Sequence, residues 1–154
     1  MKVRFTRISD ERHAVAVTRD DGSCDRIELE SRSFLRHDFA HLAIELELGI
    51  HAGFWGSVAA GGAIDGGGLD GEDMAMAESL AGPVQTLMRL EASPSDIARV
   101  LERVAPDLAS GENAKSVHER LRRLTGHWKA TSYGSDMVIE WPPRRDSSDD
   151  TASG

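Results

Sequence analysis

Apolar and polar positions alternate with a period of two in three short segments near the N-terminus, and this pattern predicts three β-strands. The segments are residues 2–8, 14–18 and 24–30. Short turns separate them, and the turn over residues 20–23 contains an Asp-Gly pair that favours a hairpin. We therefore predict an antiparallel three-strand meander at the start of the chain.

The middle of the chain has apolar positions spaced three to four residues apart, as in helices that bury one face. The predicted helices cover residues 33–48, 53–60, 73–91, 94–105 and 113–125. Gly49 and Gly126 are natural helix ends, and Gly82-Pro83 predicts a break or kink. The run Ser93-Pro94-Ser95-Asp96 is a helix start, with a serine cap, proline in the first turn and an acid at the third position.

Alternation returns near the end of the chain and predicts a hairpin from residues 128–132 and 137–141, with its turn over residues 133–136. Strands, then helices, then strands indicate an α+β fold. We expect the C-terminal hairpin to join the N-terminal meander in one sheet, with four to five helices packed on one face. A single domain is expected over residues 1–143, and residues 144–154 are expected to be a disordered polar tail.

The composition and charge of the chain disfavour several classes of binding partner and site. The 154 residues carry a net charge of −8, which disfavours binding to nucleic acids or to anionic membranes. Cys24 is the only cysteine, so the chain has neither an internal disulfide nor a cysteine zinc site. Residues 1–13 lack the apolar core of a signal peptide, and we expect a cytoplasmic protein. Arginine far outnumbers lysine, a bias typical of high-GC bacterial genes.

A glycine-rich segment, residues 61–71, formally contains the Gly-x-Gly-x-x-Gly pattern at Gly66, Gly68 and Gly71. No strand is predicted before it, and the acidic pair that follows would repel a pyrophosphate. The segment also lacks an oxygen ligand at Leu69, where a calcium loop needs one. We interpret it as a mobile connection or lid.

The candidate chemistry lies on the predicted helix over residues 33–48. At about 100° per residue, His37, Asp38, His41 and Glu45 share about a quarter of the helix circumference. They border an apolar stripe rather than the solvent side, and ionisable groups in such a place need a partner or a metal. The two histidines, four residues apart, can offer two imidazoles to one divalent ion.

This spacing supports two hypotheses. In the first, His37, Asp38, His41 and Glu45 are candidate ligands of zinc, iron or manganese, or a site for a small ligand, with Glu45 or Asp38 as a third ligand or as the group that orients a histidine. One straight helix cannot supply all ligands, so another would come from elsewhere; the candidates are His13, His51, His127, Asp70, Glu72 and Asp73. In the second, the protein is a non-catalytic interaction or structural module, with a homodimer as one form, and the cluster is a structural hydrogen-bond network.

The stretch over residues 37–62 resembles a group of small, uncharacterised bacterial proteins. The resemblance rests on Asp38, His41 and Glu45 in an Asp-x-x-His-x-x-x-Glu helix, on Leu48-Gly49, and on the aromatic-glycine segment from Phe54 to Gly61. It implies no activity. A weaker similarity, through His37-Asp38-x-x-His41, is to ubiquinone-biosynthesis proteins with a metal signature. That family places a glutamate twelve residues after the second histidine, where this chain has Gly53.

Overall fold

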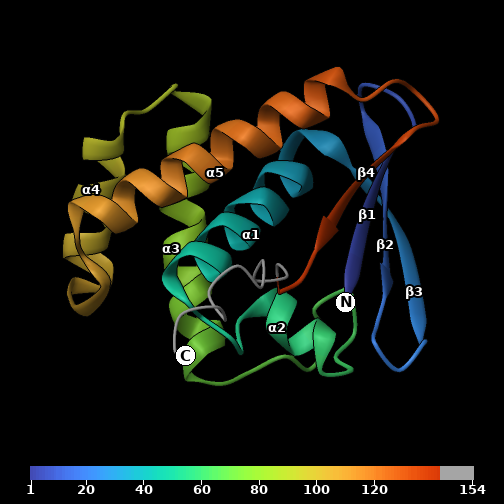
Figure 1. Cartoon of the computed structure of the whole chain (residues 1–154), viewed down its shortest axis with the longest axis horizontal. Coiled ribbons are helices and arrows are strands. Elements are labelled where there is room, and N and C mark those ends of the chain that lie inside the picture. The colour runs from blue at the N-terminus through green and yellow to red at the C-terminus, as the bar shows by residue number, and fades with distance from the viewer. Residues whose placement is uncertain (143–154) are drawn as a thin grey trace, which may run out of the picture.

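The computed structural model describes residues 1–142 and shows an α+β fold built on one antiparallel sheet (Figure 1). This confirms the predicted class. The strands are β1 (Lys2–Arg7), β2 (Arg12–Thr18), β3 (Cys24–Glu30) and β4 (Asp136–Glu140), in the order β3-β2-β1-β4. The predicted tail, residues 144–154, lies outside the described residues.

The meander forms in the register that its alternating pattern favours. Val3 pairs with Val17 and Phe5 with Val15, and Met137 of β4 completes the row beside Phe5. All five side chains are buried on the same face of the sheet. Gly22 forms the β2–β3 turn with a φ of 86°, a left-handed conformation that glycine adopts without steric cost.

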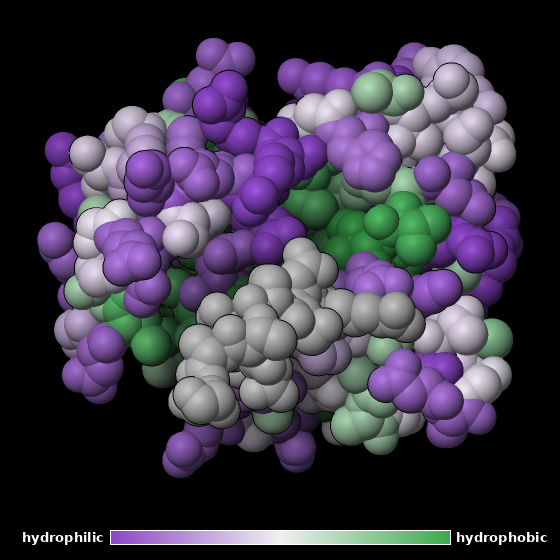
Figure 2. Space-filling model, viewed as in Figure 1, coloured by the Kyte–Doolittle hydropathy of each residue, from purple (hydrophilic) through white to green (hydrophobic). Residues whose placement is uncertain are grey.

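Helices cover one face of the sheet, as predicted (Figure 1). They are α1 (Arg36–Leu48), α2 (Phe54–Ala59), α3 (Glu72–Arg89), α4 (Pro94–Val104) and α5 (Gly111–Ala130). A π-helical turn over Ser31–Leu35 leads into α1, and a 3-10 turn over Pro106–Leu108 precedes α5. Hydrophilic residues dominate the face shown in Figure 2, with apolar residues visible mainly in its recesses. No helix within residues 1–142 combines the length and apolarity needed to cross a membrane.

Helix α1 lies at the centre of the molecule and separates two apolar cores. Phe39 and Leu42 of α1 pack against the sheet together with Trp55 of α2. Its other side carries Ala40, Ala43 and Ile44, which lie in one core with residues of α3, α4 and α5. The helix therefore has no fully polar face, and three of its ionisable residues, Asp38, His41 and Glu45, are buried.

The C-terminal hairpin is the part of the predicted fold that differs. Residues 128–130, predicted to begin a strand, extend α5, and β4 alone returns to the sheet, beside β1. Helix α5 continues through Gly126, although glycine inside a helix costs about 1 kcal/mol relative to alanine. Leu124 and Trp128 on either side of Gly126 pack into the core under the sheet, and this burial outweighs the cost.

Helix α3 also runs on where a break was predicted, with Pro83 inside it. The residue before a proline usually avoids helical geometry, because its Cβ collides with the proline ring. Gly82 has no Cβ, so the helix continues through this pair. As a result α3 forms one element from Glu72 to Arg89.

The start of α4 forms as the sequence predicts. Ser93 and Asp96 make a reciprocal capping box, and the Asp96 carboxylate accepts hydrogen bonds from the Ser93 backbone N–H at 2.9 Å and from its hydroxyl at 2.8 Å. These hydrogen bonds lower the pKa of Asp96 below its ordinary value.

We predict that Asp96→Ala lowers the midpoint of thermal unfolding at neutral pH. Because the folded-state pKa of Asp96 is depressed, its stabilisation is present above the unfolded-state pKa and is lost as the pH falls through the folded-state value. The gap between the wild type and the variant should therefore shrink in acid. Thermal scans over a pH series measure this. Glu102→Ala, on the exposed side of the same helix, is the control and should show no such trend.

Candidate metal centre

The helical spacing brings His37 and His41 together on one side of α1. Their rings meet edge to face with centroids 4.7 Å apart. Helix α3 runs beside α1 and adds Glu78 to the pair. Each of the three side chains offers a ligand atom, and these atoms lie within 4.8 Å of one another. His37, His41 and Glu78 are therefore close enough to bind one metal ion.

Small residues explain why α3 comes close enough for Glu78 to reach the histidines. Ala40 and Ala43 of α1 and Ala77 and Ala81 of α3 are all fully buried in one core. Alanine faces let two helices approach closely, because no long side chain holds them apart. Glu78 follows Ala77 directly and so lies at the edge of this tight contact.

His41 is held in a defined orientation. Only 1% of its surface is exposed, and its Nδ1 lies 3.0 Å from the Oε1 of Glu45. A carboxylate oxygen accepts, so Nδ1 carries a proton, and Nε2 is the ring nitrogen that faces away from Glu45. Nε2 lies 3.2 Å from Oε1 of Glu78, but no group within residues 1–142 meets it with hydrogen-bond geometry.

His37 repeats this arrangement with a different partner. Its Nδ1 lies 3.3 Å from the amide oxygen of Gln85, and the Gln85 amide nitrogen donates to the Ser33 carbonyl at 2.9 Å, which fixes the direction of the amide. His37 Nδ1 is therefore the donor, and its Nε2 lies 3.7 Å from Oε2 of Glu78. The side chains of His37 and Glu78 are 33% and 46% exposed, so this end of the cluster opens to solvent.

The two histidines thus point their Nε2 atoms at one carboxylate. In neutral rings these atoms carry lone pairs, which repel carboxylate oxygens unless a cation lies between the groups. Ligand atoms about 2.0–2.2 Å from a tetrahedral ion are about 3.4 Å apart. The separations of 3.2 Å and 3.7 Å between the imidazole nitrogens and Glu78 bracket that value. The side chains therefore fit a shared divalent ion.

The Glu45 carboxylate accepts hydrogen bonds from the protein backbone as well as from His41. Its buried carboxylate accepts hydrogen bonds from the backbone N–H groups of Phe54 at 2.8 Å, Trp55 at 3.0 Å and Gly56 at 3.3 Å, at the start of α2. Gly53 makes room for it, since a Cβ there would lie 2.5 Å from the carboxylate carbon. The position that carries a glutamate in the ubiquinone-biosynthesis signature must therefore be glycine in this structure.

Asp38 faces a different part of the core. Its Oδ2 lies 4.0 Å from Nε2 of His13, whose Nδ1 is 3.0 Å from the Ser31 hydroxyl. Burial raises the pKa of the Asp38 carboxyl, and the nearby His13 opposes that shift. The backbone carbonyl of Asp38 also accepts the indole N–H of Trp55 at 3.3 Å.

Of the four predicted ligands, His37 and His41 come together, whereas Glu45 and Asp38 point to other partners. The further ligand is Glu78, which is absent from the residues singled out in the sequence. A usable signal lies in α3: Glu78 and Gln85 are seven residues apart, two turns along one face, beside the alanines that pack on α1. None of His13, His51, His127, Asp70, Glu72 and Asp73 joins this cluster in the described part of the chain.

Comparison with protein-family models, curated proteins and solved structures finds no match for this chain. The resemblance of residues 37–62 to uncharacterised bacterial proteins stays a prediction.

We predict that Glu45→Ala lowers the free energy of unfolding by at least about 3 kcal/mol, because each buried donor left without a partner costs about 1–3 kcal/mol. Glu45→Gln should cost less, since one acceptor oxygen remains. Denaturant unfolding measures both. Glu47→Ala is the matched control on the same helix: Glu47 pairs with Arg120 at 2.6 Å near the surface and should cost about 1 kcal/mol or less. Equal losses at the two positions would contradict the role given to Glu45.

Proposed function

We propose that this protein binds a divalent transition metal through His37, His41 and Glu78. One observation carries the proposal: the buried Nε2 of His41 has no hydrogen-bond partner within residues 1–142, yet it is aimed at the Glu78 carboxylate. A buried nitrogen without a partner loses free energy unless something else satisfies it. Two imidazoles and one carboxylate suit zinc, iron or manganese.

The groups behind the ligands support this proposal. Metal-binding histidines usually donate their second ring N–H to a carboxylate or carbonyl oxygen, which fixes the tautomer and makes the ligating nitrogen more basic. Glu45 does this for His41, and Gln85 does it for His37. Asp38 is outside this arrangement, because its carboxylate faces His13.

Three protein ligands leave a coordination position for water or a small ligand on the open side, beside Glu78 and His37. A metal there would supply Lewis-acid chemistry, polarising a bound water or oxygen ligand. Phe54 forms an apolar side of the site, with its ring centroid 5.6 Å from that of His41. The chain's own contribution is to hold the ligand set rigid on its buried side and open on the other.

The competing function is a structural one, in which both histidines are protonated and form ion pairs with Glu78. Glu45 would keep its role in the fold on either account, because its backbone contacts do not involve a metal. Variants of Glu78 and His37 can distinguish metal binding from the structural function. Both side chains are partly exposed, so they can be changed without opening the core.

We predict that tag-free protein binds Zn²⁺, Mn²⁺ or Fe²⁺ near one equivalent, and that Glu78→Gln and His37→Asn each weaken the affinity at least about tenfold. Calorimetric titration measures affinity, and the absorption spectrum of the Co²⁺ form reports nitrogen and oxygen coordination. Glu45→Gln should weaken binding without removing a ligand.

Two matched variants serve as controls. Glu72 lies on the same helix as Glu78, and His127 is an exposed histidine on α5. Neither Glu72→Gln nor His127→Asn should change the affinity for the metal. Less than about a tenth of an equivalent of metal after reconstitution would contradict the proposal and favour the structural network. Unchanged affinity in both Glu78→Gln and His37→Asn would place any bound metal elsewhere.

A further inference from the structure

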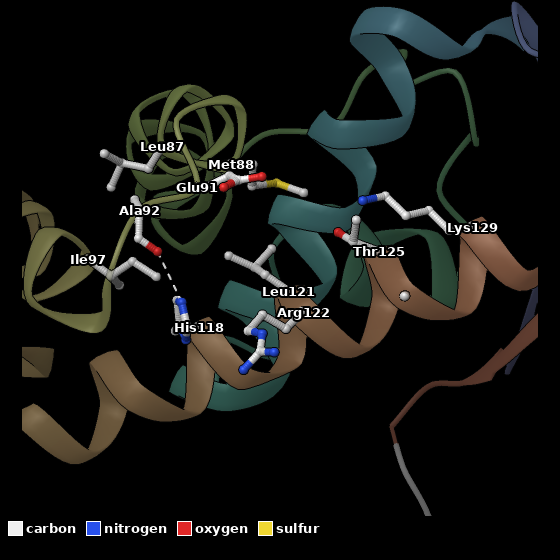
Figure 3. Close-up of a pocket in the computed structure, with 11 residues that line it drawn as sticks. Leu87, Met88, Glu91, Ala92, Ile97, His118, Leu121, Arg122, Thr125 and Lys129 are labelled. Carbon is white, nitrogen blue, oxygen red and sulfur yellow. Dashed lines mark hydrogen bonds between the residues drawn. The ribbon is translucent and has the colours of Figure 1, made fainter.

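A second candidate site lies away from the metal cluster, in a pocket of about 450 Å³ between the C-terminal end of α3, α4 and α5 (Figure 3). Small-molecule sites usually have volumes of about 300–1,000 Å³. His118 closes one end, where its Nε2–H donates to the Ala92 carbonyl at 3.0 Å. This contact ties α5 to the chain that follows α3 and gives the pocket a fixed wall.

The floor of the pocket is apolar, and its α5 wall is cationic. Leu87, Met88 and Leu121 contribute the floor, and the side chains of Arg122 and Lys129 flank it (Figure 3). Neither cation makes a side-chain hydrogen bond or ion pair with another group in residues 1–142. Thr125 lies between them on the same helix face, so a hydroxyl and two cations line the α5 side of an apolar hollow.

Two residues that line this pocket, Gly126 and Glu91, are unfavourable residue types for the backbone conformations they adopt. Gly126 lies inside α5, where glycine is the poorest helix former apart from proline. A Cβ at Gly126 would meet nothing within 4 Å, so packing does not require glycine there. Glu91 adopts a φ of 51°, the only positive value at a non-glycine residue in the described chain. Such costs gather at functional sites, and here both lie on one pocket.

We propose that this pocket binds a small amphipathic carboxylate: an apolar chain or ring that carries one anionic group. The apolar part would lie on Leu87, Met88 and Leu121, and the carboxylate would lie at the α5 wall between Arg122 and Lys129. Removing apolar surface from water supplies the main driving force, and the two cations select the sign of the head group. Gly126 leaves the wall open for the ligand.

Glu91 sets the orientation and the charge of the ligand. It lies beside Met88 on the α3 side, across the pocket from the α5 cations (Figure 3). An anionic group is therefore favoured at α5 and repelled at α3. A ligand with a second anionic group at its far end would meet Glu91, so a single carboxylate fits best.

The probe is decanoate, measured by displacement of the fluorescent anion 8-anilinonaphthalene-1-sulfonate from the full chain, below micelle concentrations and with EDTA present. Decanoate should displace the dye, whereas decyltrimethylammonium, with the same chain and opposite charge, should bind at least tenfold more weakly. Glu78→Gln should not change decanoate binding, which separates this site from the metal cluster.

Four variants test the placement. Arg122→Gln and Lys129→Gln should each weaken decanoate binding about two- to fivefold, the range expected for one exposed ion pair. Glu91→Gln should strengthen it by a similar factor. Gly126→Phe should fill the pocket and abolish binding, whereas His127→Phe, next to it on α5 but outside the pocket, should bind as the wild type does.

Circular dichroism checks that each variant is folded. Equal binding of decanoate and decyltrimethylammonium would overturn the assignment of an anionic ligand. Unchanged affinity in folded Gly126→Phe, or in the Arg122→Gln/Lys129→Gln double variant, would overturn the pocket as the site. If Gly126→Phe does not fold, the Arg122→Gln/Lys129→Gln double variant and Glu91→Gln test whether the pocket is the site. The three residues changed in them are exposed, so these variants should fold. Failure of decanoate to displace the dye or to bind directly would overturn the proposal as a whole.

Discussion

The buried carboxylate of Glu45 is the interaction on which the centre of the molecule depends. A carboxylate in the interior is stable only where several donors replace its water. Here the donors come from two directions, from the backbone at the start of α2 and from the imidazole of His41. One side chain therefore joins α2 to α1 and also fixes a ring that points toward α3. Trp55 shows the structural consequence: it is fully buried under the sheet and packs on Phe5 at 6.0 Å.

The cluster around His41 has an inner and an outer half with different physical properties. The inner half, formed by Glu45 and the backbone of α2, satisfies its own hydrogen bonds and is closed to solvent. The outer half, formed by His37 and Glu78, is half exposed and leaves the Nε2 of His41 without hydrogen-bond geometry. An incomplete buried network costs free energy unless a ligand completes it. The unequal halves are typical of a ligand set that a rigid shell holds in place.

The sequence predicts the fold well where local pattern and tertiary packing agree. The period-two segments form β1 to β3, and the serine-proline start of α4 forms its capping box. Helix α5 does not end at Gly126 as predicted, and of the break or kink predicted at Gly82-Pro83 the break is absent, since packing keeps both helices continuous. At Gly126 the local cost is about 1 kcal/mol, and a single buried large side chain offsets more than that. Pro83 inside α3 costs about 3 kcal/mol, which takes the burial of more than one side chain to offset.

For the candidate site, the helical period brings together only residues of one helix. It identifies His37 and His41, and it suggests Glu45 as a group that orients a histidine, which the structure shows for His41. It cannot identify Glu78 or Gln85, because their positions depend on how closely α3 packs on α1. Likewise, spacing alone places Asp38 beside the histidines, whereas the sheet residue His13 faces it in the fold. Contacts between elements decide which carboxylate reaches which histidine.

The His37–His41–Glu78 cluster and the pocket share α3, and its continuity through Pro83 decides how they relate. Glu78 and Gln85 face α1, whereas Leu87, Met88 and Glu91 line the pocket within the next two turns. Coupling between two sites requires an element with two alternative arrangements. Ala77 and Ala81 of α3 and Ala40 and Ala43 of α1 are packed without exposed surface, and close-packed contacts of this kind resist sliding. Helix α3 therefore acts as a fixed frame for both, and a ligand in the pocket should leave the geometry of Glu78 unchanged.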